Sequence, residues 1–189
     1  MHRILSRSIA LTALTLAAGL LSGCSAAAEQ GTAPPRVSEE SSAAFSMSDL
    51  MFAQMMIPHH EQAVDMAELA LDRSDDADIR QLSEQIRDAQ QPEIEQMSSW
   101  LNAAGMTQMA HDMGMHGMVD DDDMAELSAA TGAEFDRLFL EAMIVHHEGA
   151  IEMTRMIIDS NNSEVRALAE SIISSQSAEI ELMRTLLSR

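Results

Sequence analysis

Two stretches of the sequence, "MMIPHHEQAVDM" at residues 55–66 and "AMIVHHEGAIEM" at residues 142–153, decide the fold. They match at a constant offset of 87, and at this offset residues 49–76 align with residues 136–163. After one deleted loop residue the offset becomes 86 and holds as far as Met97, which pairs with Met183. The chain therefore contains an internal duplication, and each copy has the pattern of a helix pair.

The helix signals repeat in both copies. The first copy predicts helices at about residues 48–72, with Ser48 as N-cap, and 76–104, ended by a glycine. The second copy predicts a helix from about Thr131, where "TGAE" offers a capping box, to about residue 159. Its partner runs from about Ser163 to the C-terminus. Strand signals are absent, so we expect an all-α fold, an antiparallel four-helix bundle made from two duplicated helical hairpins.

The histidines lie on the apolar stripe of the first helix in each copy. Steps of four and three residues align Phe52, Met56, His59, Ala63, Met66 and Ala70, and in the second copy Phe139, Met143, His146, Ala150, Met153 and Ile157. This period predicts that His59 and His146 point inward between methionines. The following histidines, His60 and His147, lie about 100° further round the helix.

In an up-down-up-down bundle the first and third helices run in the same direction, so equivalent positions should lie at equal depth. Counting at about 1.5 Å per residue brings Gln90 and Gln176 to the level of the histidines. Glu93 and Glu179 follow one turn along. Met97 and Met183 should then lie beside Met56 and Met143.

Two interpretations of this level remain open. One is a hydrogen-bonded core in which the methionines only pack. The other is a metal site, which we prefer because burying four imidazoles without a metal or a complete network is costly. The candidate ligands are His59, His60, Met56, Met66, His146, His147, Met143, Met153, Glu93, Glu179, Met97 and Met183.

A proline interrupts only one of the copies. Pro58 should free the carbonyl of Gln54 and bend the helix, whereas Val145 occupies the equivalent position. The kink is therefore not needed in both copies, and the sequence gives no reason for it.

The connector between the copies, residues 105–124, has no helical apolar period and is rich in methionine. Thioethers are soft ligands that select Cu(I), and imidazole accepts either copper state or zinc. We therefore expect a second site among Met109, His111, Met113, Met115, His116 and Met118. The alternative is an apolar flap on the bundle. The four aspartates at residues 120–123 are read as a solvated run before a helix, although they could also offer oxygen ligands.

The N-terminus has the pattern of an export signal. Arg3 and Arg7 precede an apolar run that is short for a membrane span and ends in "LSGC", which resembles the lipobox of bacterial lipoproteins. This resemblance implies a signal peptide at residues 1–23, lipid attachment to Cys24 and a flexible tether at residues 24–45. An ordinary signal peptide is the alternative. With one cysteine, no internal disulfide can form.

Charge and motifs limit the functions of the remaining domain, residues 46–189. Removing the leader leaves 9 basic and 31 acidic residues, a formal charge of −22, which argues against binding nucleic acid or anionic lipid surfaces. No Glu-x-x-His occurs, as di-iron bundles require, and no His-Glu-x-x-His zinc protease motif occurs either. We therefore expect no enzyme activity.

The duplicated His-His-x-x-Ala-x-x-Met pattern closely resembles the signature of an exported family, the domain of unknown function 305. The resemblance covers about residues 46–189 and implies a ferritin-like four-helix bundle; relatives include a cyanobacterial periplasmic copper-handling protein. It places His59, His60, Met66, His146, His147 and Met153 at the suspected site. We expect a lipid-anchored, extracytoplasmic protein that captures copper, with Cu(I) favoured over Cu(II) or zinc, and that passes it to an unknown partner or keeps it. The alternative is a metal-free interaction module tethered to the cell envelope.

Overall fold

The computed structural model of the protein describes residues 44–109 and 116–189. These residues form helices and no strands, so the all-α class is confirmed. The predicted leader, the predicted lipidation site Cys24 and almost all of the predicted tether lie outside the described residues. The helices are α1 (Met47–Arg73), α2 (Ala77–Ala103), α3 (Asp121–Ala129), α4 (Gly132–Thr154) and α5 (Ser163–Leu187). None of these helices is long and apolar enough to cross a membrane.

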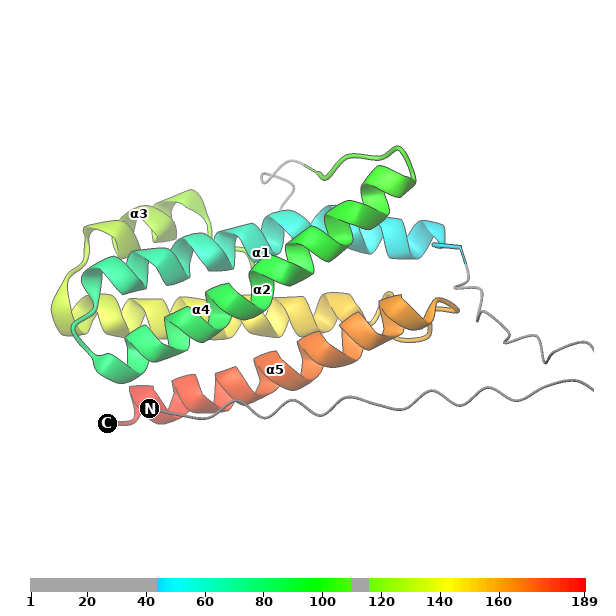
Figure 1. Cartoon of the computed structure of the whole chain (residues 1–189). Coiled ribbons are helices and arrows are strands. Elements are labelled where there is room, and N and C mark those ends of the chain that lie inside the picture. The colour runs from blue at the N-terminus through cyan, green and yellow to red at the C-terminus, as the bar shows by residue number, and fades with distance from the viewer. Residues whose placement is uncertain (1–43, 110–115) are drawn as a thin grey trace, which may run out of the picture. The chain divides into compact units, whose positions relative to one another are not determined.

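The two copies form two helical hairpins. α1 packs along α2, α4 packs along α5, and the hairpins meet mainly through α1 and α4, whereas α2 and α5 touch only slightly (Figure 1). α1 and α4 run in opposite directions, so the start of one helix lies beside the end of the other. The expectation that these helices run in the same direction is therefore wrong.

This antiparallel crossing divides the core into two apolar clusters. One cluster joins the start of α1, around Phe52, to the end of α4, around Met153. The other joins the end of α1, around Met66, to the start of α4, around Phe139. The buried histidines lie between the two clusters along both helices.

Side-chain caps fix three of the long helices at residues close to those predicted. Ser46, and not Ser48, caps α1 and forms a capping box with Asp49. Asp76 caps α2 and Asn162 caps α5, each accepting bonds from two backbone N–H groups. Thr131 lies at the N-cap of α4 but makes no side-chain bond, so the predicted capping box does not form.

The segment between the hairpins and the end of α4 differ from the prediction. The last residues of the predicted connector begin α3, where Asp120 accepts from the backbone of Asp123 and three aspartates occupy the first turn, a favourable place for negative charge. α4 ends at Thr154 instead of residue 159. The Thr154 hydroxyl donates to the carbonyl of Ile151, and the backbone then tightens into turns, a local competition that weakens helices.

Candidate metal centre

His59 and His146 meet at the crossing of α1 and α4. Their ring centroids are 3.8 Å apart, with the planes inclined by 40°, and both residues are fully buried. The inward orientation predicted from the stripe is therefore correct. Because the two copies are related about this point, the histidines coincide in depth although the helices run in opposite directions.

This level contains most of the unpartnered polar groups in the described part of the chain. Among the described residues, eleven buried side-chain atoms lack a hydrogen-bond partner, and six of them are ring nitrogens of the four histidines. They include all four ring nitrogens of His59 and His146. The other two are Nδ1 of His60 and Nδ1 of His147, and three more of the eleven atoms belong to Gln90 and Gln176. Such atoms are costly to bury unless something binds them. The histidine level therefore fits a metal ion bound by the lone pairs of imidazole nitrogens.

Burial keeps the central imidazoles neutral. Loss of hydration, followed by the neighbouring His60, lowers the pKa of His59 from 6.5 to about 3, although the backbone of His116 acts in the opposite direction. Burial, followed by His59, likewise lowers the pKa of His146 well below 6.5. A neutral imidazole has a free lone pair, which is the form that binds metals.

The outer histidine of each copy pairs with a glutamate of its own hairpin. His60 Nε2 lies 2.8 Å from Glu93 Oε2, and His147 Nε2 lies 2.7 Å from Glu179 Oε2. A carboxylate accepts hydrogen bonds, so Nε2 is the donor and the unpartnered Nδ1 keeps its lone pair. Carboxylates orient metal-binding histidines in this way. In this arrangement Glu93 and Glu179 orient the histidines.

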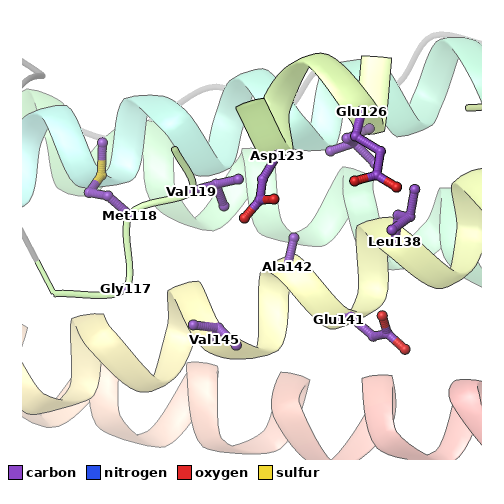
Figure 2. Close-up of a pocket in the computed structure, with 10 residues that line it drawn as sticks. Gly117, Met118, Val119, Asp123, Glu126, Leu138, Glu141, Ala142 and Val145 are labelled. Atoms are coloured by element: carbon purple, nitrogen blue, oxygen red, sulfur yellow. The ribbon is translucent and has the colours of Figure 1, made fainter. Parts of the chain in front are cut away.

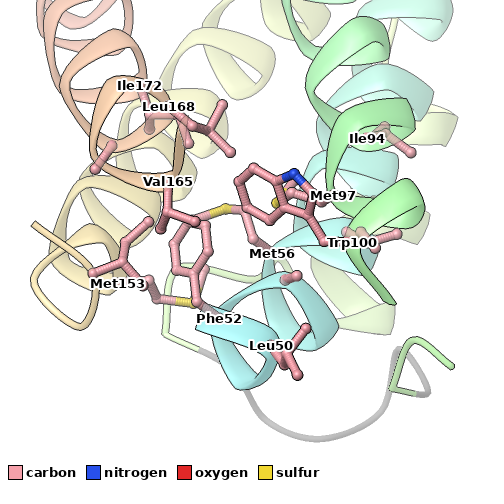
Figure 3. Packing of buried hydrophobic residues seen from close by; sticks show 14 of the residues in the cluster. Leu50, Phe52, Met56, Ile94, Met97, Trp100, Met153, Val165, Leu168 and Ile172 are labelled. Atoms are coloured by element: carbon pink, nitrogen blue, oxygen red, sulfur yellow. The ribbon is translucent and has the colours of Figure 1, made fainter. Parts of the chain in front are cut away.

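The candidate methionines lie in two groups, one in each core cluster. Met56, Met97 and Met153 are buried in the first cluster, where Figure 3 shows them with Phe52 and Trp100. Met66, Met143 and Met183 are buried in the second. The expectation that Met56 and Met143 share a level is therefore wrong, because α1 and α4 are antiparallel. Met56 and Met97 share the first cluster and Met143 and Met183 share the second, in agreement with the prediction that each pair lies within one hairpin.

Oxygen and nitrogen ligands alone do not complete a site. Among residues 44–109 and 116–189, no three His, Cys, Asp or Glu side chains are grouped so that they could hold one ion. A metal here would need few ligands, or thioethers in addition to imidazole. That donor set suits Cu(I) better than zinc.

The connector residues are only partly described. His111, Met113 and Met115 lie outside the described residues. Met109 is half-buried and its N–H donates to the carbonyl of Gln54 at 3.1 Å. The side chain of His116 is exposed. Met118 lines an open pocket of about 300 Å³ between the connector, α3 and α4, and Figure 2 shows it apart from the pocket's carboxylates. No described contact joins these side chains into a second site.

Three residues that hold the connector were not predicted. Gln54 donates through Nε2 to the carbonyl of Thr107 at 2.6 Å. Gln62 makes two hydrogen bonds of 2.8 Å with the backbone of Val119, one as donor and one as acceptor. Gly149 packs against Gly117. The signal available in the sequence was the difference between the copies, since Gln62 aligns with Gly149.

The family model for the domain of unknown function DUF305 matches residues 49–187. The chain belongs to the DUF305 family. Similar solved structures include a DUF305 fragment from Deinococcus radiodurans (33% identity, TM-score 0.71, covering 76% of this chain and 97% of that one). A putative secreted DUF305 protein from Streptomyces coelicolor is 32% identical (TM-score 0.70, 75% and 92%). CopM in its Cu(I)-bound form is 32% identical (TM-score 0.66, 76% and 97%).

CopM has also been solved in Cu(II)-bound and Ag-bound forms, at 34% and 31% identity. No curated protein matches this DUF305 chain.

Proposed function

We propose that this DUF305 protein captures copper outside the cytoplasm, with Cu(I) as the favoured cargo. The observation that carries the proposal is the buried pair His59 and His146, whose four ring nitrogens have no partner among the described residues. Two more lone pairs, on Nδ1 of His60 and His147, lie unpartnered on the neighbouring residues.

The chemistry of this level favours a soft ion. The central imidazoles stay neutral, and buried methionines lie on both sides of them along α1 and α4. Thioether and imidazole together select Cu(I), and Ag(I) is a close chemical substitute. CopM is similar over three quarters of this chain and has been solved with Cu(I), Cu(II) and Ag, which supports copper and leaves the oxidation state to the measurement.

We propose further that the protein is exported and held at the membrane by lipid on Cys24. The support is the "LSGC" pattern after a short apolar run, together with the relative described as putatively secreted. The long connector between two antiparallel hairpins supports the ferritin-like four-helix bundle, in which one long crossover joins the second and third helices. The methionine-rich connector is proposed as a second, collecting site, and copper as a cargo that is stored or passed on instead of a catalytic cofactor.

A Cu(I) competition titration against a colorimetric chelator, under reducing conditions, tests the main proposal. The chain from residue 25 onward, which contains every described residue, should compete at a fixed stoichiometry. His59→Ala with His146→Ala should weaken binding, whereas Glu152→Ala with Glu68→Ala, exposed on the same two helices, should not. No competition by the unaltered chain would contradict the proposal and favour a metal-free interaction module.

Two further arms separate the sites and the metals. Deleting residues 106–118 removes the connector methionines but keeps both His59 and His146 in the chain, so a loss of one equivalent of copper with the other retained would assign a second site to the connector. Parallel titrations with Cu(II) and Zn²⁺ are needed because imidazole alone binds all three ions. Tighter binding of zinc than of Cu(I) would contradict the choice of metal.

A further inference from the structure

The two copies differ non-conservatively around the histidines at two positions. Between Met56 and Met66, seven of eleven positions are identical to the second copy and two are conservative changes. The exceptions are Pro58, which aligns with Val145, and Gln62, which aligns with Gly149. In the structure both exceptions affect the connector, Gln62 through its own hydrogen bonds and Pro58 through the Gln54 carbonyl that it leaves free.

Pro58 provides the connector with a hydrogen-bond acceptor. In a regular helix the N–H of residue 58 would donate to the carbonyl of Gln54, but proline has no N–H. The N–H of Met109 takes that place at 3.1 Å. The Gln54 side chain also donates to the carbonyl of Thr107 at 2.6 Å. Residues 107–109 are therefore anchored to α1 one turn before His59.

Gln62 holds the connector again where it returns to α1. Its side-chain amide forms both a donated and an accepted hydrogen bond with the backbone of Val119, each 2.8 Å long. The Gln62 amide thus satisfies both the N–H and the carbonyl of Val119, so this backbone needs no other hydrogen-bond partner. The connector is thus fixed on α1 both before and after the histidines, at Gln54 and at Gln62.

Gly149 brings the connector against α4. A Cβ at this position would lie 2.3 Å from the carbonyl oxygen of His116 and 2.6 Å from Cα of Gly117. A Cβ on Gly117 would in turn lie 3.0 Å from the Val145 carbonyl and 3.1 Å from that of His146. Gly117 also has φ of +87°, which favours glycine. Only two glycines permit this backbone contact directly beside His146.

We infer that residues 116–119 form a strap, held by Gln62 and Gly149, which closes the crossing of α1 and α4 over His59 and His146. Both histidines are fully buried. The strap contacts the two hairpins differently. α1 provides hydrogen bonds through Gln62, whereas α4 provides a close backbone contact at Gly149. Copper entering or leaving the pair from this side has to displace it, and that consequence alone rests on the proposed function.

Carbethoxylation of histidine by diethyl pyrocarbonate tests the strap without metal. The chain has no tyrosine, and its eleven basic residues are all arginine, so histidine is the principal target. Each site is followed by mass spectrometry in the chain from residue 25 onward. In the unaltered protein we expect slow modification of His59 and His146, with the exposed His116 as a fast internal reference.

Gly149→Ala and Gln62→Ala should each expose the pair. The first places a Cβ against the strap while improving helix propensity, and the second removes both hydrogen bonds to Val119. Modification of His59 and His146 should accelerate by roughly tenfold or more, in Gln62→Ala through the loss of two hydrogen bonds and in Gly149→Ala through the steric contact. Glu152→Ala, on an exposed position of α4, is the matched control. Rates within about twofold of the unaltered protein in both variants would overturn the inference.

Pro58→Ala tests the anchor separately. The restored N–H at position 58 competes for the Gln54 carbonyl, so the Met109 amide should exchange with deuterium faster by roughly tenfold when followed by NMR. Val145→Ala places alanine at the equivalent position without adding an N–H, so it should leave the exchange of the Met109 amide unchanged. If Met109 exchange were unchanged in Pro58→Ala, the proline would not be the reason that the Gln54 carbonyl binds Met109. If copper binds, its release to a chelator should also be faster in Gly149→Ala; an unchanged release rate beside faster carbethoxylation would place the metal's route elsewhere.

Discussion

The imidazole rings of His59 and His146 touch where α1 crosses α4, 3.8 Å between centroids, and each ring comes from an equivalent position of the duplicated sequence. Around this contact the structure places two histidine–glutamate pairs and, further along each helix, two groups of buried methionines. Each of these layers predicts a different experimental result.

The central pair should make the protein sensitive to acid. His59 has a pKa lowered to about 3 by burial, and that of His146 is also well below 6.5, whereas both titrate near 6.5 in the unfolded chain. The contribution of the two neutral histidines to the free energy of unfolding should be fully present above pH 6.5. It should fall as the pH drops from 6.5 towards 3, because in this range only the unfolded chain takes up these protons. For His59 this contribution changes by about 1.4 kcal/mol per pH unit between pH 6.5 and about 3, and His146 acts in the same direction.

Urea denaturation at pH 7 and pH 5 measures this effect. His59→Leu with His146→Leu should lose less stability between the two pH values than the unaltered protein. The exposed His116→Leu should behave like the unaltered protein. An equal loss in the double variant would show that other groups cause the acid sensitivity.

The carboxylates that hold the outer histidines should matter for metal affinity more than for folding. Glu93→Gln and Glu179→Gln keep the size of the side chain but remove the charge that fixes Nε2 of His60 and His147 as donor. We expect Cu(I) affinity to fall by about 10- to 100-fold in the double variant. Glu95→Gln with Glu181→Gln, exposed neighbours on the same helices, are the controls. A competition titration with no difference between the two pairs would contradict the orienting role.

Thioether ligation should distinguish Cu(I) from the other ions. Met56→Leu with Met143→Leu conserves volume, so stability should change by less than about 1.5 kcal/mol for each substitution. Binding of Cu(I) should weaken by roughly tenfold or more while that of zinc stays the same, because leucine has no sulfur. The exposed Met47→Leu with Met51→Leu provides the comparison. Equal effects on both metals would assign the methionines to packing alone.

A single tryptophan connects the two hairpins and reports on their contact. Trp100 of α2 is buried, and its Nε1 donates to Glu164 of α5 at 2.9 Å, while Gln96 donates to the same carboxylate oxygen at 3.0 Å. Glu164→Ala should cost about 1–3 kcal/mol, since it leaves the indole N–H without an acceptor. Tryptophan fluorescence during denaturation measures it, with the exposed Glu170→Ala as control.

The sequence predicted the elements of the fold better than their arrangement. The period of the apolar stripe located both hairpins and showed that His59 and His146 point inward, because local spacing determines which face of a helix is buried. It did not determine the relative direction of α1 and α4, since the connector is long enough for either. The level of the histidines was nevertheless right, because they lie at the point that relates the two copies, whereas Met56 and Met143 lie away from it.

Pro58 and α3 show a second limit of the sequence. The proline frees the Gln54 carbonyl, as its chemistry requires, but the acceptor's new partner is Met109, more than fifty residues away. A contact of that kind leaves no periodic pattern. α3 is nine residues long and starts with a run of aspartates, so its apolar period is too short to recognise.

The antiparallel relation of α1 and α4 has a consequence for how such a protein could be built. Because equivalent positions of the two copies meet at His59 and His146, an approximate two-fold axis passes between these residues, and two separate molecules of one hairpin could assemble into the same pocket, each giving one half. Covalent fusion adds what a symmetric dimer lacks, a single linking segment that must favour one half over the other. The two copies differ accordingly, with Pro58 and Gln62 on α1 where α4 has Val145 and Gly149. The surroundings of His59 and His146 are therefore not equivalent, and a metal ion would meet different residues on approaching each.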